Sequence, residues 1–247
     1  NKVGARNAAV VALTFPSSPL AARSGQTVVT GLPLRSAIAD LAERRASAQG
    51  AGAARREAAE RLGVNPDAPT LLVTGGSLGA LHVNESMTGG ADALPEGAQV
   101  IHLTGRGKDE PVRKAVEAAG LSDRWHVIDY LTTMEDALAV ADLVVCRSGA
   151  GTVAEMEALG LPCIYVPLPI GNGEQRLNAA DHVAAGGAQL IDDKDFTAEF
   201  VRRNVFPLLG STRLADMAAA SQSLGRAGAA RALADLALAQ VKEGGHE

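Results

Sequence analysis

Short apolar runs alternate with longer segments of helical spacing from about residue 70 onward. The apolar runs predict strands at 70–74, 99–103, 126–129, 142–146, 163–166 and 188–191. The longer segments predict helices near 79–92, 108–119, 134–141, 151–159 and 174–185. This order is typical of βαβ units and predicts an α/β fold with a doubly wound, Rossmann-like parallel sheet. Such sheets bind ligands beyond the carboxyl ends of their strands, so the loops that follow the strands are the places to look for site residues.

The two ends of the chain follow a different pattern. Ala8–Thr14 and Thr27–Thr30 predict two strands joined by a proline-containing loop, too little to form a domain alone. From Thr197 to about Gln240 the chain is expected to be helical, and the last helix, Ala229–Val241, has an apolar stripe with no evident place on the sheet. We therefore expect both ends to pack against a part of the protein that this chain lacks.

Composition narrows the functional classes. The 247 residues are 47% hydrophobic and 3% aromatic with a formal charge of −5, so neither a basic surface nor a stacking platform for nucleic acid is expected. The two cysteines and five histidines share no metal-ligand spacing, and no metal or cofactor is expected. No apolar stretch reaches the roughly 18 residues that cross a membrane.

The segment Gly75–Gly79, with the sequence G-G-S-L-G, follows a predicted strand and precedes a predicted helix, an arrangement that favours anions. Ser77 breaks the dinucleotide pattern G-x-G-x-x-G, and Thr104–Arg106 supply no acid after the next strand. The spacing also fits the nucleophile elbow of hydrolases, but His182 falls within a predicted helix and His246 lies near the C-terminal end. A phosphate loop for a nucleotide sugar and a glycine turn without a ligand are the remaining interpretations.

A second strand, loop and helix motif reads C-R-S-G-A-G-T-V-A-E from Cys146 to Glu155. Thr152 and Glu155 have the spacing of a capping box, which stabilises a helix start without any ligand. Alternatively, Glu155 accepts two hydrogen bonds from a ribose diol while the amides of Gly151 and Thr152 face a phosphate. The residues themselves leave both interpretations open.

A third motif, P-L-P-I-G-N-G-E-Q-R-L-N, runs from Pro167 to Asn178. Glu174 and Gln175 lie on the first turn of a predicted helix, where grouped polar residues suit a hydroxyl-rich ligand such as a sugar. A solvated helix start would carry the same residues. The D-x-D pattern at Asp193–Asp195 occurs in metal-dependent sugar transferases, but we interpret Asp195 as a helix cap.

Together these motifs resemble the MurG family. The resemblance rests on G-G-S-L-G-A at 75–80, C-R-S-G-A-G-T-V-A-E at 146–155 and P-L-P-I-G-N-G-E-Q-R-L-N-A at 167–179. In addition, G-L-P-L-R at 31–35 is similar to the family's G-N-P-V-R at the linker between its domains. The resemblance extends over essentially the whole chain, which looks like an actinobacterial member.

The resemblance implies an inverting transferase that moves N-acetylglucosamine from UDP-GlcNAc to the MurNAc O4 of lipid I, giving lipid II for peptidoglycan. It implies a GT-B fold, with residues 1–34 a remnant of the N-terminal acceptor domain, 35–225 the C-terminal UDP-GlcNAc-binding domain and 226–247 a helix that packs back on the N-terminal domain. The catalytic base, the contacts to lipid I and the contact with the cytoplasmic face of the cell membrane then lie in the absent half. No catalytic residue is expected in this chain.

The resemblance also implies roles for individual residues. Ser77 would contact the α-phosphate, Arg35 the diphosphate, Glu155 the ribose diol and the Leu131 backbone the uracil edge. The remaining residues expected to bind UDP-GlcNAc are Gly76, Ala150, Gly151, Thr152, Glu174 and Gln175. Two alternatives remain open, a donor-binding module that is inactive alone and a related GT-B transferase that acts on diacylglycerol.

Overall fold

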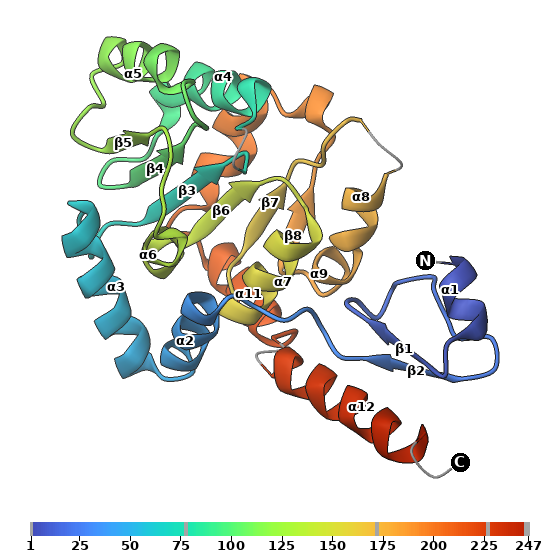
Figure 1. Cartoon of the computed structure of the whole chain (residues 1–247). Coiled ribbons are helices and arrows are strands. Elements are labelled where there is room, and N and C mark those ends of the chain that lie inside the picture. The colour runs from blue at the N-terminus through green and yellow to red at the C-terminus, as the bar shows by residue number, and fades with distance from the viewer. Residues whose placement is uncertain (1, 77–78, 171–172, 226–227, 245–247) are drawn as a thin grey trace.

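The computed structural model describes residues 2–76, 79–170, 173–225 and 228–244, and its centre is a six-stranded parallel sheet (Figure 1). The strands lie in the order β5-β4-β3-β6-β7-β8, which is the doubly wound order that the alternating pattern predicted. The chain therefore has the predicted fold class. The strand bounds are β3 Thr70–Thr74, β4 Gln99–Leu103, β5 Trp125–Ile128, β6 Leu143–Cys146, β7 Cys163–Tyr165 and β8 Ala188–Leu190.

Helices cover both faces of this sheet (Figure 1). They are α2 Ser36–Arg45, α3 Ala48–Leu62, α4 Leu81–Gly89, α5 Asp109–Ala118, α6 Met134–Val140, α7 Ala150–Leu159, α8 Glu174–Asn178, α9 Ala180–Ala184, α10 Ala198–Phe200 and α11 Thr212–Gln222. The last helix, α12 Ala229–Gly244, projects away from the sheet (Figure 1). The helix expected at 174–185 is thus two short helices. The helical C-terminal region also contains a π-helical turn, Val201–Val205, followed by a 3-10 turn, Phe206–Leu208.

Alternation along the strands assigns each side chain to one of two cores. Leu71 and Val73 of β3 point into a core with α4, α5 and α11, whereas Leu72 points into a core with α2, α3, α6 and α7. Both cores are apolar, so the strands are continuous apolar runs rather than alternating ones. This is the reason that their positions could be predicted from the sequence.

Alanine replaces larger residues where helices pack closely. Ala54, Ala58 and Ala59 of α3 are at most 2% exposed, and α3 packs against α6. Ser47 accepts a hydrogen bond from the Gly50 amide and caps the start of α3, while Gly63 ends the helix in a left-handed conformation. Small side chains therefore allow α3, which our sequence interpretation did not include, to pack closely against α6.

The N-terminal strands form a separate two-stranded sheet. They are β1 Val10–Leu13 and β2 Gln26–Val29, and they pair with each other in parallel after the short helix α1 Lys2–Asn7. Val11 and Leu13 belong to a small apolar cluster that includes Ala5 of α1. Figure 1 shows this unit set apart from the large sheet, on the side toward which α12 projects. The division at residues 34 and 225 remains a prediction.

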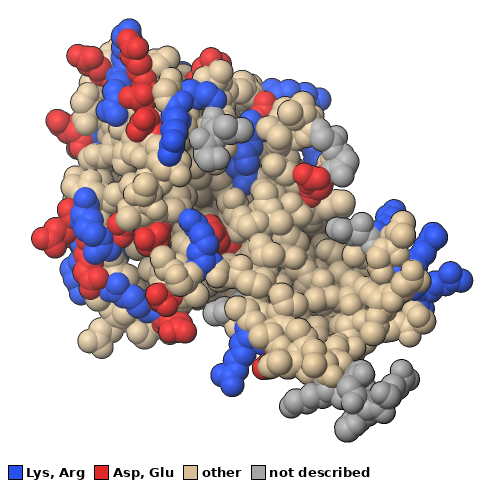
Figure 2. All heavy atoms as spheres, viewed as in Figure 1, with Lys and Arg blue, Asp and Glu red and all other residues tan. Residues whose placement is uncertain are grey.

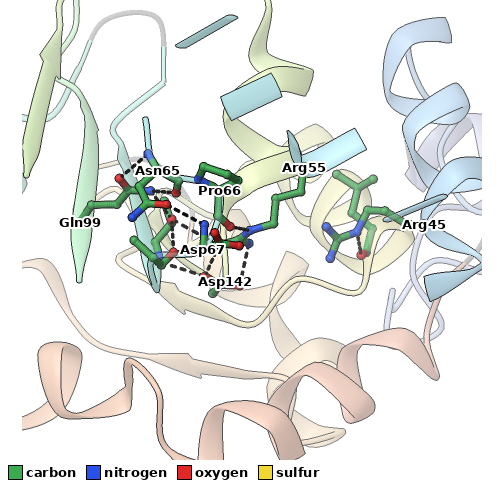
Figure 3. Close-up of polar contacts among 10 residues, drawn as sticks. Arg45, Arg55, Asn65, Pro66, Asp67, Gln99 and Asp142 are labelled. Carbon is green, nitrogen blue, oxygen red and sulfur yellow. Dashed lines mark hydrogen bonds and ion pairs between the residues drawn. The ribbon is translucent and has the colours of Figure 1, made fainter. Parts of the chain in front are cut away.

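A polar network fixes the amino edge of the sheet, where β3, β4 and β6 begin (Figure 3). Both terminal nitrogens of Arg55 donate to Asp142, each at 2.9 Å, while Arg55 Nε donates to the Pro66 carbonyl at 2.6 Å. Asp142 also accepts from the Thr70 amide at 2.8 Å, and Gln99 donates to Thr70 Oγ1. One arginine of α3 therefore ties the starts of two strands together.

Two buried histidines belong to the core. His102 accepts a hydrogen bond from Trp125, the single tryptophan, which is 2% exposed. His182 contacts the Tyr165 hydroxyl through Nδ1 at 2.9 Å and Ser221 Oγ through Nε2 at 2.7 Å. Burial lowers the pKa of His102 to about 3 and that of His182 to about 4. Both rings are therefore neutral at pH 7.

We expect His182 to make the protein acid-sensitive. The ring titrates near pH 6.5 in the unfolded chain and about pH 4 in the folded one, so its contribution to stability is complete above pH 6.5 and falls as the pH drops toward 4. In urea unfolding at pH 7.5 and 5.0, the wild type should lose more stability than His182→Gln. Carboxylates titrate in both proteins, so equal losses would contradict a role for this ring.

Candidate functional site

The first candidate site lies where the strand order reverses, between β3 and β6. Loops after β3, β4, β5 and β6 surround a hollow of about 220 Å³, which we call the central hollow. Predicted site residues that line it are Arg35, Gly76, Leu131, Thr152 and Glu155.

The glycine loop after β3 closes one side of the central hollow. Gly79 has φ +66°, and a Cβ on it would lie 2.1 Å from the Thr104 carbonyl oxygen, so glycine is required where this loop touches the loop after β4. Helix α4 follows without a side-chain cap at Ala80. Ser77 lies outside the described residues, and its proposed phosphate contact remains a prediction.

Of the two interpretations left open for Thr152 and Glu155, the capping box is wrong. Helix α7 begins at Ala150 with Gly149 as its N-cap, so Thr152 is the third helical residue and is too late to cap the helix. Gly149 provides no side-chain cap, and a Cβ on Gly151 would meet nothing within 4 Å. Within the part of the chain that the structure describes, the N-cap of α7 provides no side-chain acceptor for the first amides, whereas Ser47 provides one in α3.

Glu155 instead forms an ion pair with Arg35. Arg35 Nη2 and Nε donate to Glu155 Oε1 at 2.9 and 3.1 Å, and the side chains are 59% and 16% exposed respectively. Arg35 stands at the start of α2, after the segment that follows β2. The two residues expected to contact diphosphate and ribose thus contact each other here. Their separation of 120 residues made this pair invisible to local sequence reasoning.

An aromatic side chain lies at the β5 side of the central hollow. Tyr130 lines the hollow, is 40% exposed and has the Arg106 guanidinium 4.0 Å from its ring centre. Leu131, expected to contact the base through its backbone, follows directly and packs against the core. Sequence reasoning did not single out Tyr130 or Arg106, because one aromatic residue in a loop carries no spacing signal.

A second hollow of about 320 Å³, the side hollow, lies beyond β7 and is lined by Glu174 and Gln175. Gln175 Oε1 accepts a hydrogen bond from the Leu168 amide at 2.9 Å, which holds its side chain against the preceding loop. Asn178 Nδ2 donates to the Ser148 carbonyl at 3.1 Å and links this loop to the second motif. The structure thus separates Glu174 and Gln175 from the residues of the central hollow.

Not every predicted residue lines a hollow. Ala150 packs against the core and Gly151 is exposed at the start of α7. Asp195 is not the expected cap, since Thr197 Oγ1 accepts from the Phe200 amide and caps α10. Its neighbour Asp193 contacts Arg147 and His82 at the boundary of the hollows, an arrangement that sequence reasoning missed.

The described residues offer neither a metal-binding cluster nor a membrane-spanning helix. Within these ranges, no group of three or more His, Cys, Asp or Glu side chains has the arrangement to hold a metal ion. Over the same part of the chain, no helix combines the length and apolarity needed to cross a bilayer. His246 lies outside the described residues. Figure 2 shows charged side chains mainly over the sheet domain, while the surface toward the N-terminal sheet and α12 is largely uncharged.

Comparison with known proteins identifies the family. Residues 70–233 match the glycosyltransferase family 28 C-terminal domain. The chain belongs to this family. Curated relatives include a UDP-N-acetylglucosamine–N-acetylmuramyl-(pentapeptide) pyrophosphoryl-undecaprenol N-acetylglucosamine transferase from Bifidobacterium longum, 46% identical over 95% of this chain. Its counterpart from Clavibacter michiganensis is 45% identical over 96% of this chain.

A solved structure gives the same result. MurG from Acinetobacter baumannii superposes with a TM-score of 0.69 at 25% identity, over 93% of this chain and 60% of that one. The resemblance to MurG proteins is therefore confirmed. The chain spans less than two thirds of its relatives, 63% of the Bifidobacterium protein and 60% of the Clavibacter protein.

Proposed function

We propose that this chain is the donor-binding part of an N-acetylglucosaminyltransferase that converts lipid I to lipid II. The observation that carries the proposal is the central hollow, where the uncapped start of α7 stands beside the mostly buried carboxylate of Glu155. A helix N-terminus attracts phosphate and a carboxylate accepts hydrogen bonds from a diol, so the pair suits a nucleoside diphosphate. The identity of the sugar and of the undecaprenyl-linked acceptor is inferred from the names of the relatives.

In this proposal each part of the donor has its own place. Leu131 and Tyr130 would lie at the uracil, Glu155 at the ribose, and Arg35 and Ser77 at the diphosphate. Gly76 and the α7 residues Ala150, Gly151 and Thr152 would surround the nucleotide. Glu174 and Gln175 would place the sugar in the side hollow, where their polar groups can contact its hydroxyls.

The chemistry would be direct displacement at the anomeric carbon by the acceptor O4, with inversion. Helix N-termini and arginines would stabilise the negative charge that develops on UDP. Residues outside this chain would provide the base that deprotonates the acceptor and the contacts to the acceptor's lipid. They would also make the peripheral contact with the cytoplasmic membrane face. The 247-residue chain is therefore expected to bind donor without transferring the sugar.

We expect calorimetric titration of this chain to show binding of UDP-GlcNAc and UDP, and incubation with lipid I to give no lipid II. UDP-glucose should bind more weakly than UDP-GlcNAc, since the acetamido group is then missing from the side hollow. Absence of UDP binding would contradict the donor site, and lipid II formation would contradict the assignment of the base to another part of the protein.

A further inference from the structure

Three side chains form a continuous polar chain between the two hollows. Arg147 Nη1 donates to Asp193 Oδ1 at 2.5 Å, and His82 Nδ1 contacts Asp193 Oδ2 at 3.0 Å. The three come from different places: His82 is the second residue of α4, Arg147 directly follows β6, and Asp193 lies in the 3-10 turn after β8. The Asp193 carboxylate therefore connects its own turn with the loop after β6 and with the first turn of α4.

The position of this chain relates it to both hollows. Arg147 lines the central hollow and Asp193 lines the side hollow, so their ion pair lies at the boundary. The side chains of Arg147 and Asp193 are 14% and 15% exposed. Water solvates these two charges poorly. Removing either residue would therefore leave the charge of the other without a compensating partner.

Asp193 is part of what sets the direction of the Arg147 guanidinium. The same Nη1 also donates to the carbonyls of Val166 at 3.0 Å and Pro167 at 3.1 Å, where the chain leaves β7. All three acceptors therefore bind the same nitrogen of Arg147. The Asp193 carboxylate is the charged one, and it comes from a different element than the two carbonyls. His82 contacts the second oxygen of Asp193, which limits rotation of the carboxylate.

We propose that Asp193 is a positioning residue for the diphosphate of the donor. This inference rests on the proposed function, in which the nucleoside occupies the central hollow and the sugar the side hollow. The diphosphate joins these two parts and must cross their boundary, where Arg147 is held. Asp193 fixes Arg147 for that contact, and His82 fixes Asp193.

The test compares UDP with uridine, because the difference between them isolates the diphosphate. In calorimetry with the 247-residue chain, Asp193→Ala should weaken UDP binding by about 10-fold, the scale of one charge-assisted hydrogen bond. Uridine binding should change less than about twofold. Asp193→Asn, which keeps an acceptor for Arg147, should retain part of the UDP affinity, and His82→Ala should weaken UDP binding in the same direction by a smaller factor.

Asp195→Ala is the matched control, because it removes an exposed carboxylate from the same turn without touching Arg147. It should leave both affinities unchanged. Tighter UDP binding by Asp193→Ala would show that the carboxylate repels the anion and would overturn the proposal. Equal weakening of UDP and uridine binding would show that Asp193 only supports the structure of the site, and this would also overturn the proposal. Unchanged UDP binding by both Asp193→Ala and His82→Ala would overturn it as well. If the wild type binds no UDP, the proposed function itself fails.

Discussion

Glu155→Gln is expected to weaken UDP binding by about 10- to 100-fold. A carboxylate can accept hydrogen bonds from both ribose hydroxyls, whereas an amide offers one acceptor oxygen and loses the charge. A hydrogen bond to a charged group contributes about 1.5–3 kcal/mol, which corresponds to the stated range. The melting temperature without ligand should change little, since the lost ion pair with Arg35 is half exposed and such pairs contribute about 0–1 kcal/mol. Calorimetry and thermal unfolding measure both effects.

Two controls separate ribose recognition from the loss of the ion pair. Arg35→Ala breaks the same pair from its other side and should leave uridine binding intact, because Glu155 keeps its charge. A 2′,3′-dideoxy-UDP ligand should bind the wild type and Glu155→Gln with similar, weak affinity. UDP binding by Glu155→Gln as tight as that of the wild type would refute the ribose assignment.

Asp142→Ala should reduce the free energy of unfolding by about 2–3 kcal/mol. The substitution removes the two carboxylate oxygens that accept hydrogen bonds from Arg55. One of these oxygens also accepts from the Thr70 amide. Breaking a fully buried pair costs about 3–5 kcal/mol, and the expected loss is smaller because Arg55 and Asp142 are 22% and 35% exposed. Urea unfolding measures the change.

An exposed ion pair between α2 and α3 provides the comparison. Glu57 of α3 accepts from Arg44, and these side chains are 51% and 40% exposed. Glu57→Ala should cost less than about 1 kcal/mol, since water screens an exposed pair and solvates each partner. Similar losses for Asp142→Ala and Glu57→Ala would mean that the network at the amino edge does not stabilise the sheet.

The parallel sheet could be predicted because its strands are buried on both faces. Thr70–Thr74 and Leu143–Cys146 are short, largely apolar runs in which every residue is buried. Helices α2 and α3 escaped prediction for a physical reason. The buried face of α3 consists of Ala54, Ala58 and Ala59, whose small side chains give little contrast with the exposed face, and α2 buries only Ile38, Leu41 and Ala42 among charged neighbours.

The candidate site was predictable as a set of loops but not as a set of contacts. Glycine loops after strands indicated the edge of the sheet, and the hollow there contains Arg35 and Glu155. Their ion pair, like the contact of Asp193 with Arg147, depends on packing between distant elements. Local propensity also misplaced the start of α7, because Thr152 has a capping residue's chemistry while Gly149 has the extended backbone.

The buried position of Trp125 determines what fluorescence spectroscopy can measure on this protein. Its indole lies in β5 at one edge of the large sheet, between His102 and the edge-on ring of Phe206. Excitation of the single tryptophan therefore reports unfolding of the sheet domain, with an emission maximum that shifts to longer wavelength as water reaches the ring. Nucleotide binding between β3 and β6 should leave that emission nearly unchanged. An added fluorophore or a labelled nucleotide is needed to follow ligand by optical methods.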